Sequence, residues 1–178
     1  MVIFLAGAHG VGKTFLGRLA TKTLQFRFAV ASSLIRDEMD SKQSWGKTKR
    51  TRNIDSNQEA LISAVTKIQK DGDTTLVLDG HFVLRNESGD LTPLPSGIFK
   101  RLGVGSVILL EAPVHVVRDR LEERGAPQSL ESISELEKAE LDNARHVCEE
   151  IGIPLTRLRS PSKEELLLTL KKVSGMRE

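Results

Sequence analysis

The sequence predicts an α/β fold in which a five-stranded parallel sheet lies between two layers of helices. Short apolar runs alternate along the chain with segments whose apolar residues recur at helical spacing. The runs are apolar without interruption, as is typical of strands buried on both faces of a parallel sheet. The chain has 178 residues, the length of one ordinary domain, and shows no internal repeat or linker. We therefore expect a single domain.

Five strands and six helices are expected from these patterns. In chain order, the predicted strands are 2–6, 28–31, 75–78, 106–110 and 153–158. The predicted helices are 15–24, 34–39, 55–68, 113–124, 132–151 and 164–173.

Turn and cap residues limit the elements in the first half of the chain. Gly7 ends the first strand, and Ser32 and Ser33 offer an N-cap to the helix at 34–39. The segment 40–53 is polar and basic and has no strong period. We expect a loop or a helical hairpin there.

In the second half, residues 125–127 (Gly-Ala-Pro) separate two helices, and Ser162 caps the last one. The inner stripe of the long helix at 132–151 is predicted to be Ile133, Leu136, Leu141, Ala144 and Val147. Cys148 lies on the same helix and is expected to be a packed thiol. A single cysteine excludes an internal disulfide framework.

The segment after the first strand has the spacing of a phosphate-binding loop, and it stands between a predicted strand and a predicted helix. Its glycines allow a tight turn, and its backbone N–H groups and the helix N-terminus attract an anion. Lys13 adds a charge for the outer phosphates, and Thr14 offers a hydroxyl to magnesium. We therefore predict a nucleoside triphosphate and Mg²⁺ as cofactors. The predicted cofactor-binding residues are Gly7, Ala8, His9, Gly10, Val11, Gly12, Lys13, Thr14 and Phe15.

Asp79 ends a predicted buried strand, where an acid holds magnesium in proteins with such a loop. Thr14 and Asp79 are therefore the predicted metal ligands. The alternative is that Asp79 only forms a turn with Gly80. His81 follows, and it either contacts a substrate or hydrogen-bonds the backbone.

The overall charge of +2 does not by itself call for nucleic acid, although four basic residues fall within 47–52. No apolar run reaches the length of a membrane-spanning helix, and the start of the chain lacks a signal-peptide pattern. We expect a cytoplasmic protein with no membrane partner. Oligomerisation is left open.

Together these residues resemble the nucleoside monophosphate kinases, and most closely the archaeal-type adenylate kinases. The likeness rests on the phosphate loop, on residues 77–85 with Ser88-Gly89 and Leu94-Pro95-Ser96, and on residues 108–112 with Arg118. It covers nearly the whole chain. It implies the fold of a P-loop NTPase, a three-layer α/β/α sandwich with a small lid.

The resemblance also implies transfer of the γ-phosphoryl group of ATP to a nucleoside monophosphate, with AMP the best guess. It implies one kinase domain over 1–178, with a monophosphate-binding segment at about 34–58 and a short lid at about 124–132. The implied catalytic residues are Lys13, Arg120, Arg124 and Arg145, of which Arg120 also binds ATP. The implied substrate-binding residues are Ser32, Arg36, Gln58, His81 and Arg85.

Four departures from that family leave the acceptor open, and one of them is Thr14-Phe15 in place of the more usual Ser-Thr. Residues 125–129 carry no charge where the relatives carry arginines, Gly80 stands where threonine is usual, and 40–52 is unusually basic. One alternative is another phosphorylated or hydroxyl acceptor, including a polynucleotide end. A nucleic-acid partner is less favoured because Trp45 alone is nearby for base stacking. The basic residues in question are Lys47, Lys49, Arg50 and Arg52. The other alternative is a nucleotide-controlled ATPase or switch protein.

Overall fold

The computed structural model describes residues 1–43, 54–72, 74–86 and 88–176, and it contains the predicted five-stranded sheet. The strands are β1 (Val2–Ala6), β2 (Arg27–Val30), β3 (Leu76–Asp79), β6 (Val104–Glu111) and β7 (Leu155–Arg159). Their order in the sheet is β2-β3-β1-β6-β7, and each neighbouring pair is parallel. The predicted fold class is confirmed.

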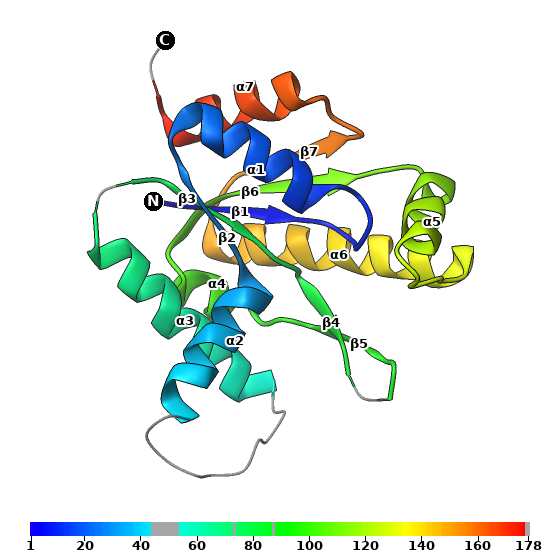
Figure 1. Ribbon diagram of the computed structural model, residues 1–178, viewed down its shortest axis with the longest axis horizontal. Coiled ribbons are helices and arrows are strands. Elements are labelled where there is room, and N and C mark those ends of the chain that lie inside the picture. Colours follow the sequence, from blue (N-terminus) through cyan, green and yellow to red (C-terminus); the bar gives the residue numbers. More distant parts are fainter. Residues whose placement is uncertain (44–53, 73, 87, 177–178) are drawn as a thin grey trace.

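Helices cover both faces of this sheet (Figure 1). The helices are α1 (Lys13–Leu24), α2 (Ala31–Gln43), α3 (Ile54–Lys70), α4 (Ser96–Arg101), α5 (Val114–Glu123), α6 (Leu130–Ile151) and α7 (Lys163–Ser174). Helices α1 and α7 pack together on one face, and α6 crosses the other. Helices α2 and α3 pack on each other beside the sheet. Among the described residues, no helix is both long and apolar enough to cross a bilayer.

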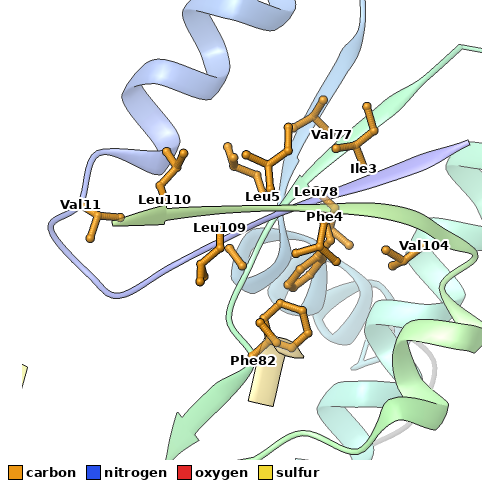
Figure 2. Packing of buried hydrophobic residues seen from close by; sticks show 14 of the residues in the cluster. Ile3, Phe4, Leu5, Val11, Val77, Leu78, Phe82, Val104, Leu109 and Leu110 are labelled. Carbon is orange, nitrogen blue, oxygen red and sulfur yellow. The ribbon is translucent and has the colours of Figure 1, made fainter. Parts of the chain in front are cut away.

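The core lies on both faces of the sheet because β1 is buried along its whole length. Figure 2 shows Ile3 and Leu5 on one face of the sheet and Phe4 on the other, as the period of a strand requires. Phe4 packs edge-to-face against Phe82 and Phe99, with ring centroids 5.2 and 5.1 Å away. Phe82 and Phe99 stack on each other at 4.5 Å. We call these three rings the aromatic cluster.

The register of β1 and β3 determines where the polar residues meet. Leu5 is opposite Asp79, so the loop that follows Ala6 and the carboxylate of Asp79 lie at the same edge of the sheet. The amide of Gly80 donates to the carbonyl of Leu5 at 3.1 Å and holds the two strand ends together. Ligands of parallel sheets bind at this carboxyl edge.

Three short elements between β3 and β6 were not expected. Strands β4 (Val83–Arg85) and β5 (Leu91–Pro93) form an antiparallel hairpin, and α4 follows it. A strand of three residues is too short to show a period of two, and prolines at 93 and 95 argue against strand and helix. The elements form because the surrounding chain supplies their partners: Asn143 on α6 donates to the carbonyls of Phe82 and Leu94.

Helix α2 begins earlier than the sequence indicated. It starts at Ala31, so Ser32 and Ser33 lie in its first turn and the predicted N-cap is wrong. On this helix the buried carboxylate of Glu38 accepts from Lys67 at 2.7 Å and from Ser63 at 2.8 Å. These bonds tie α2 to α3. Residues 44–53, including the basic cluster, lie outside the described residues.

Helix α6 differs from expectation in two places. It begins at Leu130, because the Ser129 hydroxyl caps it by accepting from the amide of Ser132 at 3.1 Å. Its inner stripe contains Glu140, which is 0% exposed, whereas Leu141 is half-buried. The thiol of Cys148 is buried as predicted, and burial raises its pKa to about 11.

Candidate active site

The loop between β1 and α1 uses glycine where the backbone requires it. Gly7, Gly10 and Gly12 have φ values of 136°, 86° and 105°, which L side chains rarely adopt. At Gly7 a Cβ atom would stand 2.3 Å from the carbonyl oxygen of Leu110. The loop therefore packs directly on the end of β6, with its curvature determined by these glycines.

Lys13 is the first residue of α1 and is 6% exposed. Its ammonium donates to the carbonyls of Gly7 at 2.5 Å and Ala8 at 3.1 Å. Burial lowers the pKa of Lys13, while Asp79, 4.0 Å away, opposes that shift. The lysine is thus held inside the loop by carbonyl groups that an anion can replace.

Thr14 and Asp79, the two predicted metal ligands, lie side by side. The Thr14 hydroxyl donates to Asp79 Oδ2 at 2.5 Å, and Asp79 is 3% exposed. A hydroxyl and a carboxylate are hard oxygen ligands of the kind that Mg²⁺ prefers. The two side chains would therefore fit as ligands of a magnesium ion.

The three arginines to which the resemblance gives catalytic roles have different surroundings. Arg120 on α5 donates to the carbonyls of Gly10 at 3.0 Å and Val11 at 3.2 Å, so it braces the loop. Arg124, just after α5, is exposed and lines the cavity described below. Arg145 is exposed on α6 and is not among the residues that line that cavity.

A cavity of about 1290 Å³ opens beside the loop. Of the predicted cofactor-binding residues it touches all but Gly7, Val11 and Arg120, and Val11 is buried in the core. Its far side is formed by α2, α3 and α4, and it includes apolar residues of the aromatic cluster. The predicted substrate-binding residues that line it are Ser32, Arg36, Gln58 and His81.

Arg85 lies elsewhere. Its guanidinium donates to the carbonyl of Gly89 at 2.8 Å and to the hydroxyl of Ser132 at 2.8 Å. It therefore joins the β4–β5 hairpin to the first turn of α6, away from the cavity lining. Arg36, by contrast, is exposed in the cavity. Its Nε atom lies 3.4 Å from Oδ1 of its neighbour Asp37, an exposed ion pair.

Sequence reasoning missed Glu140, whose carboxylate accepts from His81 and from the backbone at 82 and 83. The available signal was its spacing: it lies four residues from both Leu136 and Ala144, on the inner face of α6. It also missed the apolar lining by Phe4 and Phe99, because only the folded chain brings β1 and α4 together.

A family model described as AAA domain (AAA_17) matches residues 6–137. The chain belongs to this AAA-domain family. The match includes the phosphate loop, Asp79, Arg120 and Arg124. No curated protein gave a significant match to the sequence of this AAA domain.

Solved structures share the fold of this AAA domain at low identity. A shikimate kinase from Acinetobacter baumannii in complex with shikimate has a TM-score of 0.58 at 15% identity, covering 99% of this chain and 95% of that chain. A gluconokinase from Sinorhizobium meliloti 1021 has a TM-score of 0.54 at 13% identity, covering 98% and 91%. The chain thus has the α/β fold of P-loop kinases. Neither the family match nor these two kinases single out the adenylate kinases.

Proposed function

We propose that this AAA domain is an ATP-dependent kinase that phosphorylates a nucleoside monophosphate, with AMP the first candidate. The observation that carries the proposal is the single cavity that joins the phosphate loop to the wall formed by α2 and α3. Its volume of about 1290 Å³ exceeds the roughly 300–1,000 Å³ of an ordinary small-ligand pocket. Two nucleotides placed end to end fit such a space.

The donor end has the groups that a triphosphate needs. The loop N–H groups and the N-terminus of α1 attract the phosphates, and Lys13 exchanges its carbonyl partners for phosphate oxygens. Thr14 and Asp79 would hold Mg²⁺, which when bound neutralises charge on the β- and γ-phosphoryl oxygens. Arg124 extends from the end of α5 toward the same cavity.

The acceptor end combines apolar and polar groups. Phe4 and Phe99 offer apolar surface to a planar base, and Asn57 and Gln58 on α3 offer amides to its edge. Arg36 on α2 is the cation in this wall that we assign to the acceptor phosphate. That phosphate is already anionic, so the transfer needs no general base.

We further propose that about 34–58 forms the monophosphate-binding segment and about 124–132 the lid. In the structure only residues 125–129 separate Arg124 from the start of α6. Such a lid excludes water by a small movement. The catalytic role proposed for Arg145 depends on that movement, because it lies outside the cavity in this conformation.

The test is a coupled assay of ADP formation with ATP, Mg²⁺ and each common nucleoside monophosphate in turn. We expect turnover with AMP or a close analogue and a loss of about 100-fold or more in Lys13→Met. Lys22→Met, an exposed lysine on the same helix, is the matched control. Failure of every monophosphate to be phosphorylated contradicts the proposal.

A second candidate is a kinase for a small hydroxyl compound. It is favoured by His81, a ring in the cavity that is hydrogen-bonded to a buried carboxylate. Shikimate and gluconate, taken from the names of the structural neighbours, belong in the same assay. Slow ATP hydrolysis that no acceptor stimulates indicates a switch protein instead.

A further inference from the structure

Glu140 is the least exposed charged side chain among the residues that the structure describes, at 0%. It projects from α6 between Leu136 and Ala144, in a stripe that is otherwise apolar. Burial of a carboxylate is strongly unfavourable unless donors surround it. The contacts of Glu140 therefore indicate why an acid occupies this position.

Three donors from consecutive residues meet this carboxylate. The amide of Phe82 donates to Oε2 at 3.0 Å, and the amide of Val83 donates to Oε1 at 3.4 Å. The third contact joins Oε1 to Nδ1 of His81 at 3.0 Å. All three donors belong to the residues that come directly after Asp79 and Gly80. Through Glu140, α6 therefore holds the segment that follows β3 in place.

The same ring also contacts the phosphate loop. The ring centroids of His81 and His9 lie 4.2 Å apart, with the planes inclined by 48°. Burial is the main cause that lowers the pKa of His9 to about 4, so that ring is neutral near pH 7. A chain of contacts thus leads from the core to the phosphate loop, from Glu140 to His81 and from His81 to His9.

The bond to Glu140 determines which nitrogen of His81 is available. The carboxylate is an acceptor, so Nδ1 must carry the hydrogen that it shares with Oε1. His81 lines the cavity, and Nε2 is the ring nitrogen that remains for a ligand there. In the neutral ring this nitrogen is unprotonated and accepts a hydrogen bond.

We propose that Glu140 is a positioning residue that imposes the Nδ1–H tautomer on His81, so that Nε2 accepts a hydrogen bond from a hydroxyl or amino group of the phosphoryl acceptor. The site then favours acceptors with such a donor and disfavours those that present only anionic oxygens to His81. The role of Nε2 in turnover rests on the kinase function proposed above. The tautomer does not depend on it.

The first experiment measures the tautomer directly in the intact protein. With ¹⁵N-labelled histidine, the nitrogen chemical shifts distinguish N–H from unprotonated ring nitrogens. The chain has four histidines, and the loss of one set of signals in His81→Gln assigns the ring. We expect Nδ1–H in the wild type. In Glu140→Gln we expect Nε2–H, because the new amide group donates to Nδ1 while its oxygen keeps the amide of Phe82.

The second experiment measures steady-state kinetics of the same variants. Glu140→Gln and His81→Gln are each expected to raise the KM for the acceptor by about tenfold or more, as loss of an orienting contact does elsewhere. The KM for ATP is expected to stay within about twofold. Glu150→Gln is the matched control, because Glu150 pairs with His146 on the exposed side of the same helix.

An Nε2–H tautomer in the wild type overturns the proposal, and so does an unchanged acceptor KM in both variants. A variant that fails to fold is identified by its thermal melt, and the wild-type tautomer and His81→Gln kinetics still decide the question. If the wild type phosphorylates no acceptor at all, the kinase proposal fails, whereas the ¹⁵N shifts still decide whether Glu140 controls the ring of His81.

Discussion

The hydroxyl of Thr14 donates to the carboxylate of Asp79 at 2.5 Å, across 65 residues of sequence. Thr14 lies in the first turn of α1, and Asp79 is the last residue of β3. The two meet because β1 and β3 are neighbours in parallel register, so the loop after one and the end of the other share an edge. Two oxygen groups of the kind that Mg²⁺ prefers are thereby placed together.

Asp79→Asn should therefore remove most of the magnesium dependence of ATP binding. At about 100 times its Kd, a ligand stabilises the native state by about 2.7 kcal/mol, or roughly 5–10 °C in Tm for a chain of this size. For the wild type we expect this rise in Tm in the presence of ATP and Mg²⁺, and a much smaller rise when ATP is added with EDTA. Asp79→Asn should give the smaller shift under both conditions. Asp71→Asn, an exposed acid before β3, should behave as the wild type.

Arg120 and Arg124 should differ in their effect on the kinetics. Arg120 braces the loop through the carbonyls of Gly10 and Val11, whereas Arg124 is exposed in the cavity. Arg120→Ala should raise the KM for ATP, since it loosens the loop, and Arg124→Ala should lower kcat by about 100-fold if it stabilises the transferred group. Arg145→Ala tests whether the proposed lid closes. An effect as large as that of Arg124→Ala would show that α6 reaches the substrates.

Gly80→Thr should destabilise the fold, although the relatives that the sequence resembles carry threonine there. A Cβ at Gly80 would lie 2.7 Å from the ring of Phe4, inside the aromatic cluster. Overpacking of this kind costs about 1–3 kcal/mol in the free energy of unfolding, measured by urea denaturation. Adding Phe4→Leu should recover part of the loss, with a coupling of about 0.5–3 kcal/mol. Additive costs would show that Phe4 does not exclude the larger side chain. Gly97→Ala is the control, because a Cβ at Gly97 would meet no atom within 4 Å beyond its own helix backbone.

Cys148 should make stability depend on pH in the alkaline range. Burial raises the pKa of its thiol from 9.0 to about 11, so the folded state keeps the neutral thiol longer than the unfolded state does. The associated stability is complete below pH 9 and is lost as the pH rises toward 11. Urea denaturation at pH 8 and pH 10 should show a smaller decline for Cys148→Ala than for the wild type. Equal declines would contradict this.

Much of the fold was open to prediction because it depends on local pattern. The continuous apolar runs of β1, β3 and β6 are long enough to identify buried strands. The hairpin of β4 and β5 was not predictable, since strands of three residues carry no period and depend on Asn143 of α6 for support. The caps at Ser32 and Ser33 failed because Ala31 already continues from β2 into α2.

By itself, the sequence determined the phosphate loop, the glycines it needs, and the acid at the end of β3, because each of these follows from neighbouring residues and a short spacing. The tertiary structure alone decided which groups share the cavity. It brought Arg36 and Arg124 into the lining, left Arg85 on the hairpin and Arg145 on the outside of α6, and brought Glu140 against His81 from 59 residues away. The reason is physical: contacts between distant segments depend on how helices pack on the sheet, and no local pattern records that packing.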